Sequence, residues 1–124
     1  MNRNEAQIDD PVIAININKT YRHGINADDL YDCTRGIWRL NKHHAEQATY
    51  AFAVYQGVIK EVYEINKWFP AGSTKYLRRR FNPIDLFERF EFIGRVAPDN
   101  VRGKYIGKTL PIRHGQNPIR YFNC

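Results

Sequence analysis

The sequence predicts a small α+β domain whose mixed, mostly antiparallel sheet curls into a β-barrel and carries two or three short helices. Its 124 residues suit one domain with a hydrophobic core of its own. Roughly six short stretches are rich in β-branched and aromatic residues, and polar, glycine or proline segments separate them. Residues 50–55 are apolar on both faces, as in a strand at the centre of a sheet or barrel. We expect residues 1–11 to be a flexible N-terminal tail and residues 12–124 to form the single domain.

The first elements are a strand and a short helix. Residues 12–19, VIAININK, alternate apolar and polar side chains, which predicts a strand. Asn26 is a favourable helix N-cap, and the acidic residues just after it suit the positive end of the helix dipole, so we expect a helix up to Arg35. Gly36 is expected to end that helix in the left-handed conformation. The following residues 36–41, GIWRLN, predict a second strand.

The middle of the chain predicts a β-hairpin. Residues 42–49 are polar and suit a helical turn. Residues 50–65 then form two apolar stretches about Gln56-Gly57, a sequence typical of a tight hairpin turn. Residues 66–83 contain glycine and proline breakers and are expected to be mostly loop.

The C-terminal part alternates short helices and strands. Asn82-Pro83 is a favourable start for a short helix over 84–88. Residues 89–97, RFEFIGRVA, predict a strand, and a helical turn capped by Asp99 is expected after it. Residues 117–124, NPIRYFNC, predict the last strand.

The positive charge is concentrated in the C-terminal part of the chain. Residues 1–74 contain 8 Lys and Arg against 9 Asp and Glu, a net −1, and residues 75–124 contain 11 against 4, a net +7, which together give +6. Such asymmetry favours a polyanionic partner, most often nucleic acid. A basic, solubilising surface is the alternative interpretation, and composition supports both.

Several kinds of chemistry have no support in the sequence. Two cysteines are too few for a disulfide framework, and no apolar run approaches the roughly 20 residues that cross a bilayer. The polar, acidic N-terminus does not have the form of a secretory signal, so a cytoplasmic protein is expected. The histidine spacings fit no metal site, and the carboxylates form no catalytic pair. We therefore predict no metal, no cofactor and no catalytic residue, and we lean towards a protein that is not an enzyme.

Aromatic residues beside basic ones are the candidate binding residues. Trp38 lies between two arginines, and Trp68 follows the hairpin, so a curled sheet would bring both near Tyr55 as a stacking pocket. For each aromatic residue, packing in the core is the alternative interpretation. The KYLRRRF stretch suits phosphate contacts and base stacking. The predicted nucleic-acid-binding residues are Arg35, Trp38, Arg39, Tyr55, Trp68, Lys75, Tyr76, Arg78, Arg79 and Arg80.

The order of these motifs resembles the PUA-like superfamily, which includes the ASCH, EVE and YTH domains. The motifs are RGIW, then YAFAVYQGVIKEVYEINKW, then RFEFIGRVA and YIGK, over residues 34–108. The chain also resembles small uncharacterised bacterial proteins that share TRGIWRL and the ending NPIRYFNC. The superfamily resemblance implies a small β-barrel that binds RNA or DNA, and EVE-like and YTH-like members hold a modified base in an aromatic cage. By the same resemblance, Trp38 and Trp68 are the candidate residues of such a cage.

Three functional hypotheses remain open at this stage. The first is a non-enzymatic nucleic-acid-binding module that recognises a flipped or modified base. The second is a protein-interaction or accessory subunit of a bacterial defence or restriction system, or a homodimer built on an exposed strand edge. The third is a small hydrolase that acts on a nucleotide or nucleoside.

Overall fold

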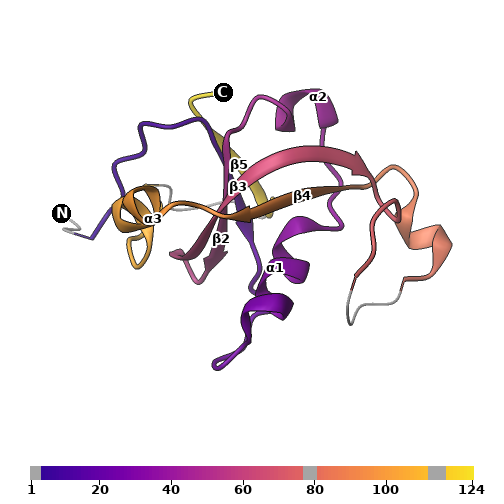
Figure 1. The fold of residues 1–124 in the computed structure, drawn as a ribbon, viewed down its shortest axis with the longest axis horizontal. Coiled ribbons are helices and arrows are strands. Elements are labelled where there is room, and N and C mark those ends of the chain that lie inside the picture. Colours follow the sequence, from indigo (N-terminus) through magenta and orange to yellow (C-terminus); the bar gives the residue numbers. More distant parts are fainter. Residues whose placement is uncertain (1–3, 77–80, 112–116) are drawn as a thin grey trace.

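The computed structural model describes residues 4–76, 81–111 and 117–124, and these ranges contain one five-stranded sheet (Figure 1). The strand order is β4-β3-β2-β1-β5. Only β1 and β2 run parallel, and the other neighbours are antiparallel. The strands are β1 (Val12–Asn16), β2 (Tyr50–Tyr55), β3 (Val58–Pro70), β4 (Phe90–Val96) and β5 (Ile119–Phe122). The α+β class with a mostly antiparallel sheet is thus confirmed. The sheet is not closed, since β4 and β5 form its edges, so the expected barrel is not confirmed.

Two α-helices lie in the connection between the parallel strands, which cannot be joined by a tight turn. Helix α1 begins after Asn26, whose side chain accepts a hydrogen bond from the Asp29 backbone N–H at 2.8 Å, as the sequence predicts. Helix α3 follows β4, and a 3₁₀ helix, η1, starts at the expected Asn82-Pro83 pair. The helix bounds are α1 (Ala27–Arg35), α2 (Lys42–Ala45), η1 (Pro83–Leu86) and α3 (Asp99–Tyr105).

Gly36 ends α1 in a different way from the one expected. Its φ of −174° is extended rather than left-handed. A Cβ at this position would overlap the Tyr76 hydroxyl and lie 2.9 Å from the Cβ of Glu91, so close approach of three segments requires glycine here. The strand expected over 36–41 is reduced to a single bridge between Trp38 and Phe90.

The second strand of the hairpin, β3, is longer than the sequence indicates. Gln56 and Gly57 have φ values of 49° and 78°, which are the left-handed values that a two-residue type I′ turn needs. Strand β3 then continues to Pro70 and pairs with β4 from Tyr63 to Pro70, so the loop expected from residue 66 starts after Pro70. The reason is that β4 supplies a partner strand, and side chains such as Trp68 gain burial in it.

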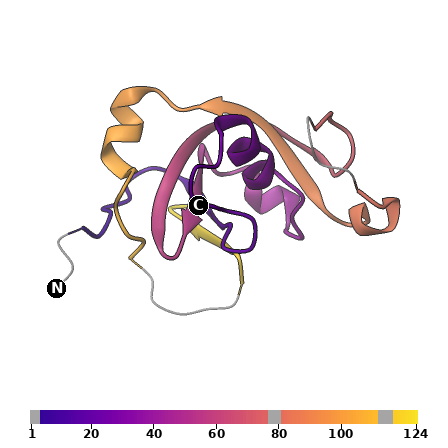
Figure 2. The same cartoon turned by 90° about the horizontal axis from the view of Figure 1, so that it is seen from below.

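The sheet buries both of its faces. One core cluster contains Ile13 and Ile15 of β1 and packs against α1 and α2, whereas Val12 and Ala14 belong to a second cluster with α3. Strand β2 has four buried residues in a row and lies at the centre of the sheet, as predicted. In Figure 2 the long β3–β4 ribbon bends over α1, and α3 lies away from it.

The described part of the expected N-terminal tail, residues 4–11, is packed onto the domain. The Ala6 backbone N–H donates to the Thr109 carbonyl at 2.7 Å, and Ala6 is buried in the α3-side core cluster. Asp9 and Asp10 both contact Lys104 and Tyr105 of α3. The apolar side chain of Ala6 and these four polar contacts hold the segment in place.

Candidate functional site

A pocket of about 670 Å³ lies where the end of β1, the end of α1 and the 81–89 segment meet. Its volume falls within the range of small-molecule sites, roughly 300–1,000 Å³. Trp38 forms part of its wall. The other described lining residues are Asn16, Ile17, Asn18, Lys19, Thr20, Cys33, Gly36, Ile37, Phe81, Asp85, Arg89 and Pro118.

The indole of Trp38 is held in a fixed position. Its Nε1–H donates to the Thr34 carbonyl of α1 at 2.7 Å, and its backbone exchanges two 2.9 Å hydrogen bonds with Phe90 of β4. The residue is half-buried and packs against the core cluster on the α1 side. Trp38 is therefore both a packing residue and one wall of the pocket, so neither of the two sequence interpretations is sufficient alone.

Three charged residues line the pocket without a carboxylate or cation of the described chain to pair with them. Lys19 follows β1, Asp85 lies in η1, and Arg89 directly precedes β4. Elsewhere, most described arginines form ion pairs, for example Arg95 with Glu64 at 2.8 Å. Charges that line a pocket and form no ion pair with the described residues are able to interact with a ligand.

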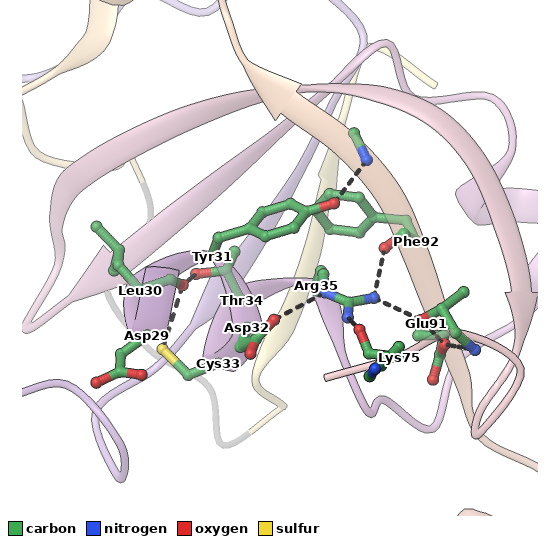
Figure 3. A network of polar contacts seen from close by, with 12 residues as sticks. Asp29, Leu30, Tyr31, Asp32, Cys33, Thr34, Arg35, Lys75, Glu91 and Phe92 are labelled. Atoms are coloured by element: carbon green, nitrogen blue, oxygen red, sulfur yellow. Dashed lines mark hydrogen bonds and ion pairs between the residues drawn. The ribbon is translucent and has the colours of Figure 1, made fainter. Parts of the chain in front are cut away.

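Arg35 does not line this pocket; it is buried at the end of α1, with only 2% of its surface exposed (Figure 3). Its Nε lies 3.1 Å from the Asp32 carboxylate, and its Nη2 donates to the Lys75 carbonyl at 2.8 Å. The guanidinium carbon lies 3.7 Å from the ring centroid of Tyr76, a cation–π contact. Arg35 thus binds the first residues of the segment that leads to the arginine run.

Glu91 completes this buried network from β4. Its carboxylate accepts hydrogen bonds from the backbone N–H groups of Gly72 at 2.7 Å and Thr74 at 2.8 Å, and a further short one from the Thr74 hydroxyl. That hydroxyl also accepts a 2.7 Å hydrogen bond from Arg35 Nη1. The Thr74 hydroxyl therefore bonds to a cation from α1, Arg35, and to an anion from β4, Glu91. Together these two side chains hold residues 72–75 in place.

The other aromatic residues predicted for the pocket do not line it. Trp68 is 2% exposed and packs edge-on against Phe92, so it belongs to the core. Tyr55 packs against Tyr21 with 4.4 Å between ring centroids, beside the hairpin turn. Of these three aromatic residues, Trp38 alone lines this pocket. Trp68 belongs to the core cluster on the α1 side of the sheet, and Trp38 packs against that same cluster.

Two of the other predicted basic residues, Arg39 and Lys75, are exposed and do not line the pocket. Arg39 is exposed and lies 3.7 Å from Glu88. Lys75 is exposed, and Tyr76 packs against Phe81, a pocket residue, with 5.1 Å between ring centroids. Arg78, Arg79 and Arg80 lie outside the described residues.

Several pocket residues were not predicted from the sequence. Asp85 and Arg89 stand in a stretch that reads as a short helix and the start of a strand, and Asn16 and Asn18 look like the polar face of a strand. None of these residues belongs to a local sequence motif that would mark it as part of a binding site. Only the folding of 81–89 against the end of β1 brings them together.

Within the described ranges, no group of three or more His, Cys, Asp or Glu residues is arranged to hold a metal ion. No helix in those ranges is long and apolar enough to cross a membrane. Comparison of the chain with known proteins finds no matching family model, curated protein or solved structure.

Proposed function

We propose that this protein is a nucleic-acid-binding module that takes one base out of the stack and into the pocket beside Trp38. The observation that carries the proposal is the combination of a fixed indole wall with cations that have no partner in the described chain, in a pocket large enough for a nucleotide. A base stacks on aromatic rings whatever its sequence, and cations hold the flanking phosphates.

The surroundings of the pocket support a polyanionic ligand. Arg89 and Lys19 line it, and Lys75 and Tyr76 start the segment that continues into the arginine run. The resemblance of residues 34–108 to PUA-like domains, which generally bind RNA or DNA, supports the same function. Membership in that superfamily, with its barrel, is part of the proposal.

The fluorescence of each tryptophan tests the proposal separately, because the chain contains only two. In a Trp68→Phe variant, Trp38 is the sole reporter, and we expect saturable quenching on titration with short single-stranded oligonucleotides. In a Trp38→Phe variant, buried Trp68 should respond little. Binding of labelled oligonucleotide, followed by anisotropy, should weaken by about 1–3 kcal/mol in Trp38→Ala, which is the usual contribution of one stacked base.

Thermal melts of each variant establish that it is folded, since Trp38 also packs against the core cluster. Trp68→Phe is the matched control and should retain oligonucleotide affinity. The proposal would be wrong if folded Trp38→Ala bound as tightly as the wild type, or if no single-stranded or duplex oligonucleotide bound to the wild type.

A further inference from the structure

We infer that the pocket selects guanine, and that the Asp85 carboxylate accepts the hydrogen bonds that distinguish it. This inference rests on the proposed function and names the base class that the same pocket takes. It is argued from the hydrogen-bonding groups that line the pocket, one at a time.

The asparagines of the pocket already use their oxygen atoms to hold the backbone. Asn16 Oδ1 accepts from the Asn18 backbone N–H at 2.8 Å, and Asn18 Oδ1 accepts from the Gln56 N–H at 2.7 Å. Thr20 donates its hydroxyl to the Ile17 carbonyl at 3.4 Å. Asp85 is the only acidic residue among the described lining residues, so it is the strongest acceptor that the pocket offers to a ligand.

The position of Asp85 is set by the start of η1. The Asn82 side chain accepts a hydrogen bond from the Ile84 N–H at 3.2 Å, and the Asp85 N–H donates to the Asn82 carbonyl at 2.9 Å. Arg89, four residues later, lines the same pocket, yet no ion pair joins these two residues. The pocket thus offers an acid and a base that do not form an ion pair with each other. A matching ligand has hydrogen-bond donors at one end, for Asp85, and negative charge at the other, for Arg89.

Guanine nucleotides have that distribution of charge and donors. Guanine carries the N1–H and the N2 amino group side by side, and a carboxylate accepts both through its two oxygens. Adenine and cytosine place a ring-nitrogen acceptor beside their amino group, which a carboxylate repels. Uracil and thymine have one N–H between two carbonyl oxygens. The phosphate attached to the guanine nucleoside would then face Arg89 or Lys19.

The experiment compares the affinities of oligothymidines that carry one central guanine, inosine, adenine or cytosine, for wild type, Asp85→Asn and Glu88→Gln. Wild type should prefer guanine to adenine by roughly 5- to 150-fold, the discrimination of one bidentate pair. Inosine, which lacks the N2 amino group, should bind between the two. In Asp85→Asn the guanine-to-adenine ratio should collapse. Glu88→Gln removes an exposed acid three residues away that does not line the pocket, and it should keep the ratio.

Failure of the inference and failure of the proposed function give different results. Oligonucleotide binding that quenches Trp38 without a guanine preference, or with one that persists in Asp85→Asn, would overturn the inference alone. A titration with GMP and AMP covers the free nucleotide as the source of the base. GMP binding that depends on Asp85, with no oligonucleotide binding, would overturn the proposed function and support the guanine assignment.

Discussion

At the scale of single residues, Arg35 is notable because it is an arginine that is buried rather than exposed to solvent. It is enclosed by Asp32 on its own helix, by Thr74 and Lys75 from the segment after β3, and by the ring of Tyr76. A buried guanidinium is tolerated because its N–H groups are hydrogen-bonded and an acid compensates its charge. Arg35 therefore acts as the attachment point for residues 72–76.

Replacement of Arg35 by methionine should lower the free energy of unfolding by about 3–5 kcal/mol, because Asp32 and Glu91 would stay buried without the guanidinium. Urea unfolding followed by circular dichroism measures this change. Arg39→Met is the matched control, and it should change stability by less than about 0.5 kcal/mol because Arg39 is exposed. Equal stability of the two variants would contradict the structural role of Arg35.

At the scale of elements, the N-terminal segment and α3 are joined by a cluster of titratable groups. Hydrogen bonds from Tyr105 and Lys104 lower the pKa of the Asp10 carboxyl, and those from Lys104 and Tyr105 lower the pKa of Asp9. Burial, followed by the hydrogen bonds to Asp10 and Asp9, raises the pKa of Tyr105 to about 12. The same two acids raise the pKa of Lys104.

These pKa shifts predict a stability that falls at both extremes of pH. The carboxylates contribute stability above their usual pKa of 3.8, and that contribution is lost as the pH falls through their lowered pKa values. Tyr105 and Lys104 contribute below pH 10, and their contribution is lost as the pH rises through their raised pKa values. Urea midpoints measured from about pH 2 to about pH 11 should therefore show a plateau of stability at intermediate pH and a decrease on both sides of it.

In the Asp10→Asn variant the acid side of the plateau should be shallower and the alkaline loss smaller. Glu5→Gln is the control on the same segment, because the Glu5 side chain is exposed and forms no ion pair with the described residues. A pH profile of Asp10→Asn that matches the wild type would show that this cluster does not hold the segment.

The edge of the sheet at β4 is also covered by α1. The Phe92 carbonyl accepts a 3.4 Å hydrogen bond from Arg35, the Gly94 N–H donates to the Tyr31 hydroxyl at 2.9 Å, and Phe90 pairs with Trp38. Side chains thus occupy backbone groups that an unprotected edge would offer to another strand. The homodimer predicted on an exposed strand edge would have to use a different surface from this part of β4.

At the scale of the whole molecule, the C-terminal positive charge is divided into two populations. Arg95, Arg102 and Lys104 pair with acids from residues 1–74, namely Glu64, Glu61 and the Asp9–Asp10 pair. Arg89, by contrast, lines the pocket without an ion pair to the described residues. Paired cations attract a polyanion weakly, so the field that a nucleic acid meets is expected to be strongest near the pocket and the arginine run.

The salt dependence of oligonucleotide binding checks this division. If Arg78, Arg79 and Arg80 neutralise phosphates, their joint replacement by glutamine should make the plot of log affinity against log salt shallower. On single strands the slope should change by about 0.7 for each phosphate that is no longer neutralised. Arg95→Gln, which removes a paired cation, should leave the slope unchanged. An equal effect of the two changes would mean that overall charge, rather than its distribution, drives binding.

Most of the local structure could be predicted from the order of the amino acids alone. Asn26 and Asn82 indicated two helix starts, Gln56-Gly57 indicated the hairpin turn, and the apolar run 50–55 indicated the central strand, because caps, turns and strand alternation depend on neighbouring residues. The position of Trp38 between two arginines likewise predicts a binding residue, since an aromatic side chain flanked by arginines is a local pattern.

Which side chains share a site, in contrast, depends on long-range packing. Gly36 is required by contacts with Tyr76 and Glu91, which are distant in the sequence, rather than by a left-handed turn. Arg35 is a buried attachment point because Thr74 and Lys75 fold onto it. The pocket joins the end of β1 to 81–89, so its acid and its arginine acquire a candidate role from the tertiary fold, which no local sequence pattern encodes.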